Sequence, residues 1–291
     1  AAVGTALPET MIPIIAIFSG QEGSEEIGIG AILGAPFMLA TLALGITGLA
    51  VIIFRNKRQS FPNLKVNKIV LKRDLSFFII VYSVAILAAF IPSRSLKLVI
   101  AGLLVITYIV YLYLTFTQAS GNNSFHALNP LYLLKFFTKR RPGLLSIIMQ
   151  ISLALGTIIF GATVFVDVIK ELAKIFDIPT FILALIIAPV ATELPEKFNS
   201  IIWVKGDKDT LALGNITGAM VFQSSLIPAL GISMTSWSLT PAAFTSAVLA
   251  LLSASLVYWQ IVRKQYLTPY QLLPGIIFYL IFAFLIVKRI F

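Results

Sequence analysis

Apolar runs long enough to cross a membrane follow one another along almost the whole chain. Of the 291 residues, 58% are hydrophobic and 12% are charged, whereas a soluble domain has about 25% charged residues. A helix needs about 20 mainly apolar residues to cross the hydrocarbon core. The sequence therefore predicts an all-α membrane protein. About nine spans are expected, at residues 1–19 (partial), 27–54, 75–91, 96–117, 144–169, 180–204, 210–235, 240–263 and 269–289.

Lys and Arg gather in the segments that these spans place on one side of the bilayer. Residues 55–74 and 118–143 are rich in both, as is typical of cytoplasmic loops. Threading the spans also puts 205–209 and 263–268 inside, and the acidic stretch 21–26 outside. The enrichment of Lys and Arg in the cytoplasmic loops of a protein in the lipid bilayer thus accounts for the net charge of +10. No basic stripe interleaved with aromatic residues is present, so no nucleic-acid partner is expected.

A short motif occurs twice within apolar sequence, as GTALPE at residues 4–9 and as ATELPE at residues 191–196. We call it the Pro-Glu motif. Proline removes a backbone hydrogen bond inside a helix, so we expect each helix to break or kink at Pro8 and Pro195. Charged side chains at membrane depth are costly and mark functional sites. The two copies, one in each half of the chain, therefore predict an internal repeat with a binding site at its interface.

The threading gives the two motif copies opposite directions. The helix with Glu9 runs from inside to outside, and the helix with Glu196 runs from outside to inside. Inverted repeats that meet near the midplane are a common transporter architecture. We predict two inverted-topology repeats of five transmembrane helices at 1–117 and 144–291, joined by a cytoplasmic connector at 118–143. By this symmetry the first repeat is incomplete, since it lacks its N-terminal helix and half of the next.

The Pro-Glu motif supplies the ligands of a hard cation. A proline frees backbone carbonyl oxygens, and in a membrane such oxygens must be buried in protein or face a cavity. Together with a carboxylate and a threonine hydroxyl they form an all-oxygen site, as Ca²⁺ prefers. We hypothesise that Glu9 and Glu196 converge on one dehydrated cation. The alternative, a structural kink with a glutamate reaching the membrane surface, is favoured for a single copy but not for a matched pair.

A second paired feature follows each motif. Residues 30–35 (GAILGA) and 214–219 (GNITGA) both have two glycines four positions apart. Such spacing lets two helix backbones approach closely. We expect this face to pack against a motif-bearing helix of the same or the other repeat.

The two paired features together resemble the alpha repeats of the sodium/calcium exchangers and the wider cation/Ca²⁺ antiporters. In that family G-T-S-L-P-E is followed by a helix opening G-N-x-x-G-S-N. Residues 211–218 (LALGNITG) are especially similar, and the resemblance covers about 1–50 and 180–235. It implies a secondary antiporter that exchanges Ca²⁺ for Na⁺, or for H⁺, by alternating access.

The resemblance also implies roles for particular residues. Glu9 and Glu196 would be the central ion ligands, and Thr5 and Thr192 would contribute oxygens. The transported cations would be the inorganic partners, and no cofactor is expected. The protein would be a multi-pass protein of the cell membrane, and its oligomeric state stays open.

The chain departs from the family pattern at several ligand positions. The serine before Leu-Pro-Glu is replaced by Ala6 and by Glu193. The Ser-Asn pair after the second glycine becomes Ala-Pro at 35–36 and Ala-Met at 219–220. These changes remove oxygens, although the Glu193 carboxylate can serve as an additional ligand.

The next ligand position and a lysine complicate the site further. The family's Asn or Asp becomes Leu39 in the first repeat and Gln223 in the second, and Gln223 is kept among the expected ligands. Lys197 follows Glu193 by four residues, the spacing of an ion pair within a helix. If that pair forms, divalent affinity falls. If Lys197 instead extends to the inner surface, Glu193 stays available to a cation.

Three other functions compete with Na⁺/Ca²⁺ exchange. The lost oxygens and the added Glu193 favour a proton-coupled exchanger of another cation. A degraded site is consistent with a non-transporting membrane protein of the same fold. An intramembrane enzyme is disfavoured, because the sequence has no cysteine, no H-E-x-x-H and no G-x-S-x-G.

Overall fold

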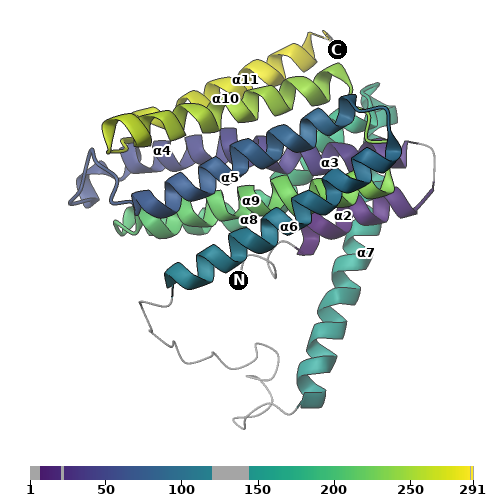
Figure 1. Ribbon diagram of the computed structural model, residues 1–291, viewed down its shortest axis with the longest axis horizontal. Coiled ribbons are helices and arrows are strands. Elements are labelled where there is room, and N and C mark those ends of the chain that lie inside the picture. Colours follow the sequence, from purple (N-terminus) through teal and green to yellow (C-terminus); the bar gives the residue numbers. More distant parts are fainter. Residues whose placement is uncertain (1–6, 21–22, 120–143, 289, 291) are drawn as a thin grey trace.

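The protein is a bundle of long helices (Figure 1). The computed structural model describes residues 7–20, 23–119, 144–288 and 290. The helices are α2 (Leu7–Phe18), α3 (Ser24–Met38), α4 (Leu44–Ile53), α5 (Lys68–Leu87), α6 (Arg94–Ala119), α7 (Leu144–Phe176), α8 (Thr180–Lys205), α9 (Asp209–Met234), α10 (Pro241–Lys264) and α11 (Pro274–Val287). Within these described residues, 7 helical segments are long and apolar enough to cross a membrane, and two shorter apolar helices accompany them. The predicted all-α membrane fold is confirmed.

Three segments that were assigned to the cytoplasmic side, 55–74, 205–209 and 263–268, meet at one end of the bundle. The backbone N–H of Leu64 donates to the carbonyl of Leu267 at 2.9 Å. Arg58, in the same loop after α4, pairs with Asp209 at the start of α9. The segments after α4, α8 and α10 therefore lie on one side, as the threading predicts.

The loops of the opposite end are also joined to one another. Ser19, just after α2, donates to Ser24 at 2.7 Å. Thr180, the first residue of α8, donates to Glu26 at 3.0 Å. Helix α2 thus ends on the side where α8 begins, so the two motif-bearing helices run in opposite directions as predicted. The division into two inverted repeats stays a prediction, and most of the connector at 118–143 lies outside the described residues.

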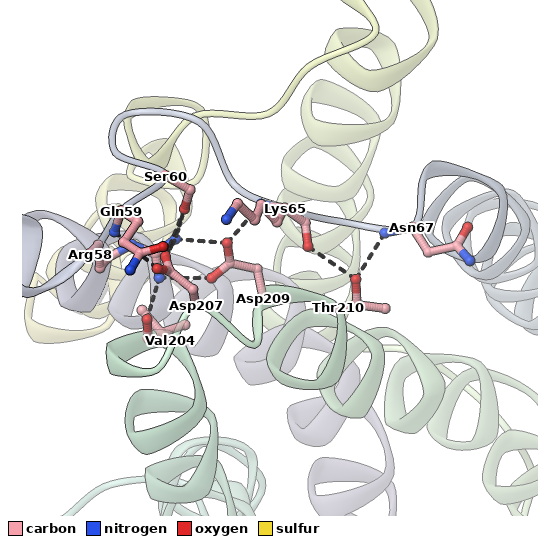
Figure 2. A network of polar contacts seen from close by, with 9 residues as sticks. All are labelled: Arg58, Gln59, Ser60, Lys65, Asn67, Val204, Asp207, Asp209 and Thr210. Carbon is pink, nitrogen blue, oxygen red and sulfur yellow. Dashed lines mark hydrogen bonds and ion pairs between the residues drawn. The ribbon is translucent and has the colours of Figure 1, made fainter. Parts of the chain in front are cut away.

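A polar network closes the end of the bundle that carries Arg58 (Figure 2). The Arg58 guanidinium donates to both carboxylate oxygens of Asp209, at 2.8 and 2.7 Å, and to the carbonyl of Val204. Asp207 accepts from the backbone N–H of Gln59 at 2.9 Å and from the Ser60 hydroxyl at 2.7 Å. The loop after α4 is thereby attached to the turn between α8 and α9. We call this set of contacts the Arg58 network.

Helix α5 begins earlier than the sequence predicts, at Lys68 rather than at residue 75. The cause is an N-cap, because the Asn67 side chain accepts hydrogen bonds from the backbone N–H groups of Ile69 and Val70. The predicted loop 55–74 is therefore too long. Asp74 lies inside the helix and is buried.

The span that contains α3 and α4 is interrupted by a π-helical segment, Leu39–Ala43. A π turn disturbs the regular backbone ladder. The hydroxyl of Ser253 on α10 donates to the carbonyl of Ala40 at 2.6 Å, and Thr41 donates to Phe37 at 2.5 Å. These bonds satisfy backbone oxygens that water cannot reach in a membrane.

Helices α3 and α8 pack in close backbone contact. A Cβ at Gly34 would overlap the carbonyl oxygen of Leu185, and a Cβ at Gly30 would lie 2.6 Å from that of Phe181. The first glycine pattern therefore packs against the motif-bearing helix of the other half, as one of the two predicted arrangements requires. The second pattern does not pack tightly in the described part of the chain, since the nearest atom to a Cβ at Gly218 is the Tyr111 hydroxyl at 3.8 Å.

Helix α7 crosses the other helices at a steep angle and leaves the bundle (Figure 1). Its buried residues, Ala162, Val166, Ile169 and Ala173, all belong to its second half. The first half exposes large apolar side chains such as Ile148, Met149 and Phe160. Exposed apolar surface of this extent suits contact with lipid rather than with water.

Candidate functional site

Glu9 lies at a small cavity where three helices meet. Its side chain is 7% exposed, in the first turn of α2. The cavity has a volume of about 10 Å³, which is close to the room that one water molecule needs. Its lining consists of Glu9 and Ile12 from α2, Ala31 and Ala35 from α3, and Ala188, Pro189 and Thr192 from α8. The structure therefore brings Glu9 and Thr192, both predicted ligands, to one space.

Thr192 provides a hydroxyl oxygen to this cavity. Its Oγ1 donates to the carbonyl of Ala188 at 3.0 Å. A hydroxyl that donates one proton keeps two acceptor lone pairs, so the Thr192 oxygen can still coordinate a cation. Position 196 follows Thr192 by four residues, the spacing that places two residues on one helix face.

Three further polar side chains form a cluster between α8 and α9. Lys197 Nζ lies 3.0 Å from Glu193 Oε2, and both side chains are almost fully buried. Gln223 on α9 donates from Nε2 to Glu193 Oε1 at 3.0 Å. Of the two arrangements left open by the sequence, the structure forms the ion pair. Lys197 does not extend to the membrane surface.

The expected break of α8 at Pro195 is absent, because α8 continues as one helix from Thr180 to Lys205. In hydrocarbon no water is present to take up freed backbone groups, so keeping the other helical bonds is favoured over unwinding. Pro8 is the second residue of α2, where proline is tolerated because the first turn has no partner for its N–H.

Two predicted ligands, Thr5 and the Glu196 side chain, lie outside the described residues, so the convergence of Glu9 and Glu196 stays a prediction. Leu39, at the position of the family's Asn or Asp, is buried without a polar group to offer. In the described part of the chain no three His, Cys, Asp or Glu side chains gather as a metal site would require. A cation at the Glu9 cavity would depend on carboxylates of α2 and α8 together with hydroxyl and carbonyl oxygens.

Helix α5 carries a buried carboxylate, Asp74, that was not predicted as part of the site. Asp74 accepts from the Thr217 hydroxyl at 2.8 Å, from the Tyr111 hydroxyl at 3.1 Å and from Arg73 at 2.8 Å. Thr217 belongs to the second glycine pattern, so Asp74 joins α5 and α6 to the helix that carries Gln223. The signal was present in the sequence, since Asp74 directly precedes a long apolar run, but it was assigned to the loop.

The family model for the sodium/calcium exchanger protein matches residues 1–117 and 146–291. The chain belongs to this family. This exchanger-family chain is 24% identical over 221 residues to the uncharacterized membrane protein MJ0091 of Methanocaldococcus jannaschii, and the match covers 76% of the chain and 64% of that relative. The chain therefore spans somewhat less than two thirds of the length of that relative.

Solved exchanger structures share the fold of this exchanger-family chain. The H⁺/Ca²⁺ exchanger CAX superposes with a TM-score of 0.70 at 17% identity, covering 99% of this chain and 78% of that one. The sodium-calcium exchanger NCX_Mj superposes with a TM-score of 0.61 at 21% identity, covering 96% and 82%. The agreement confirms the exchanger fold that the paired motifs predict.

Proposed function

We propose that the protein is a secondary antiporter that exchanges Ca²⁺ for Na⁺ or H⁺ by alternating access, in the cell membrane and without covalent chemistry. One observation carries the proposal. Glu9 and Thr192, one from each copy of the Pro-Glu motif and from helices of opposite direction, line the same cavity. Membership of the sodium/calcium exchanger family and the fold shared with an H⁺/Ca²⁺ exchanger and a sodium-calcium exchanger support it.

The proposed mechanism is competition for one set of oxygens. Glu9, Thr192, Glu196 and Thr5 form the set, and a bound Ca²⁺ or its counter-ions occupy it in turn. In each loaded state the positive charge of the bound cations neutralises the carboxylates, so the loaded site carries no net charge. A loaded protein can therefore switch the side to which the site opens, whereas an empty one would bury uncompensated charge in hydrocarbon.

Transport by purified protein in liposomes tests the proposal. Radioactive Ca²⁺ uptake is measured under an outward Na⁺ gradient and, separately, under an outward H⁺ gradient. Glu9→Gln and Glu196→Gln each remove a ligand charge and should abolish uptake. Glu171→Gln, an exposed carboxylate on α7, is the matched control and should transport normally.

The two gradients also decide the counter-ion. Uptake driven by Na⁺ alone identifies Na⁺/Ca²⁺ exchange, and uptake driven by H⁺ alone identifies the proton-coupled alternative. Unchanged uptake in Glu9→Gln would reject the assigned site. No uptake under either gradient, with no divalent-cation binding by the purified protein, would favour a non-transporting member of the family.

A further inference from the structure

We infer that the groove between α4 and α8 binds one acyl chain of an anionic phospholipid from the cytoplasmic leaflet, and that Arg55 and Lys205 hold the phosphate of its headgroup. The inference concerns a lipid site on the lipid-facing surface of the bundle. It is independent of the proposed exchange reaction and of the ions that take part in it.

The groove contains a cavity of about 70 Å³. The Thr47 hydroxyl at this cavity already donates to the Ala43 carbonyl at 2.8 Å, and the Lys197 ammonium lies 3.0 Å from Glu193 Oε2. A void leaves its lining atoms without van der Waals partners on one side, and a mainly apolar space favours hydrocarbon over water. The lining residues are Ala43, Ile46, Thr47, Lys197, Phe198 and Ile201.

Exposed apolar side chains continue from the cavity toward the cytoplasmic end. On α4, Ile46, Leu49 and Ile53 are three and four residues apart and share one helix face, and Leu49 and Ile53 are exposed. On α8, Phe198 and Ile202 share a face in the same way, and their exposed fractions are 57% and 66%. Exposed apolar surface within a membrane span faces lipid chains. The two faces therefore border a groove that is open to lipid.

Two cations lie at the cytoplasmic end of this groove. Arg55 begins the short turn after α4, and Lys205 ends α8, three residues after Ile202; both cations are exposed. Lys205 Nζ lies 5.8 Å from the centre of the Phe54 ring, so the ends of the two helices are close together. Basic side chains at the cytoplasmic surface attract anionic headgroups, and both residue types bind phosphate oxygens well.

The depth of the cavity below the two cations matches one membrane leaflet. Phe198 precedes Lys205 by seven residues and Ile46 precedes Arg55 by nine, which corresponds to about 10–14 Å along a helix axis. The hydrocarbon core is about 30 Å thick, so one leaflet supplies about 15 Å. A phospholipid with its phosphate at the cations therefore has a chain that reaches the cavity. A small water-soluble anion would contact the cations without reaching it, so the geometry favours a phospholipid.

Fluorescence quenching by brominated lipids tests the inference. The chain contains no cysteine, so Ile202→Cys provides a unique attachment point for a fluorophore beside the groove. The purified protein is placed in phosphatidylcholine bilayers that contain a fixed fraction of brominated phosphatidylglycerol or of brominated phosphatidylcholine. The anionic lipid should quench the label more strongly. The same label at Ile80→Cys, an exposed position on α5, should be quenched equally by both lipids.

Substitutions at the two ends of the groove complete the test. Arg55→Gln and Lys205→Gln should each lower the preference for phosphatidylglycerol about fivefold, which is the contribution of one basic residue near a membrane surface. Arg263→Gln is the matched control, because Arg263 is an exposed cation at the same end of the bundle that lies over the Trp259 ring at 5.3 Å. It should keep the preference. Ile46→Phe fills the cavity and should lower the preference, because the acyl chain loses its place.

The inference is wrong if the two lipids quench the label at position 202 equally, or if the anionic lipid is preferred to the same extent at position 80. It is also wrong if the preference survives both Arg55→Gln and Lys205→Gln. Ile201→Phe fills the same cavity from α8 and guards against misfolding of Ile46→Phe, and the melting temperature of each variant shows whether it is folded. A preference that is unchanged in folded Ile46→Phe or folded Ile201→Phe would overturn the acyl-chain site.

Discussion

Arg58 and Asp209 form a bidentate ion pair between the loop after α4 and the start of α9, which are far apart in the sequence. The nitrogen–oxygen distances are 2.8 and 2.7 Å, and neither side chain is exposed. Asp209 is the first residue of α9, where negative charge is favourable because of the helix dipole. The pair fixes the start of the helix that also carries Gln223 and Thr217.

Removing Asp209 should destabilise the protein strongly. Asp209→Ala removes the bidentate partner of the buried Arg58 guanidinium and leaves it only Asp207, at 3.3 Å, and breaking a buried pair costs about 3–5 kcal/mol. Thermal unfolding in detergent micelles measures the effect. Glu25→Gln is the control, because Glu25 bonds Ser236 at the exposed opposite end and should cost less than about 1 kcal/mol. Equal losses in the two variants would contradict the assigned role of the pair.

Asp207 gives the Arg58 network a pH dependence. Burial acts to raise the pKa of Asp207, but hydrogen bonds from Gln59 and Ser60 and the charge of Arg58 outweigh it, so its pKa lies below the ordinary value of 3.8. The stabilisation is therefore complete above pH 3.8 and is lost as the pH falls through the pKa of the folded state.

The matching experiment compares the melting temperatures of the wild type and Asp207→Asn between pH 3 and pH 7. The variant should melt lower at neutral pH, and the difference should shrink only as the pH falls below about 3.8. A difference that stays constant to pH 3 would show that the Asp207 charge does not contribute.

Gly34 should tolerate no side chain. A Cβ at this position would overlap the Leu185 carbonyl oxygen, and a backbone atom of a packed helix cannot move aside without separating α3 from α8. Gly34→Ala should cost about 1–3 kcal/mol, as overpacking typically does. Gly102→Ala on α6 meets no described atom within 4 Å and should be neutral or stabilising by up to about 1 kcal/mol. A neutral Gly34→Ala would disprove the close contact.

Ala35→Ser should increase affinity for Ca²⁺. Ala35 lines the Glu9 cavity, and a serine would return the hydroxyl oxygen found in the family pattern. One additional favourable contact of about 0.5–1.5 kcal/mol corresponds to roughly two- to tenfold in affinity. Calorimetric Ca²⁺ titration of purified protein measures it. Ala50→Ser, buried on α4 away from this cavity, should leave the affinity unchanged, and an equal gain there would reject the cavity as the site.

Asp74 should matter for stability through its hydroxyl partners. Asp74→Ala leaves the Thr217 and Tyr111 hydroxyls without their acceptor, which costs about 1–3 kcal/mol for each buried group left unpaired. Tyr111→Phe removes a donor together with its own need for a partner and should cost less. Melting temperatures of the two variants test the order, and a larger loss in Tyr111→Phe would contradict it.

The sequence by itself determined the membrane class, the order of the spans and the family. Apolar length decides whether a segment stays in hydrocarbon, and that property is local. The threading based on Lys and Arg grouped residues 55–74 with 205–209 and 263–268, and the structure brings these three segments to one end of the bundle. The paired Pro-Glu motifs likewise indicated the helices whose side chains meet at the Glu9 cavity.

Tertiary structure alone decided which polar groups bind one another. The spacing of Glu193 and Lys197 allowed either an ion pair or a lysine at the membrane surface, and burial against α9 with Gln223 selected the pair, since a buried carboxylate needs a partner. The sequence pattern placed Asp74 in a loop. In the structure Asn67 caps α5 ahead of it, and the Thr217 hydroxyl on α9 donates to the Asp74 carboxylate. The π turn at Leu39–Ala43 likewise accepts a hydrogen bond from Ser253, a residue of α10 that no local pattern connects to Ala40. The length of an apolar run is a property of one segment and decides whether that segment crosses the membrane. The hydrogen bonds and ion pairs described above join different segments, which only the fold brings together.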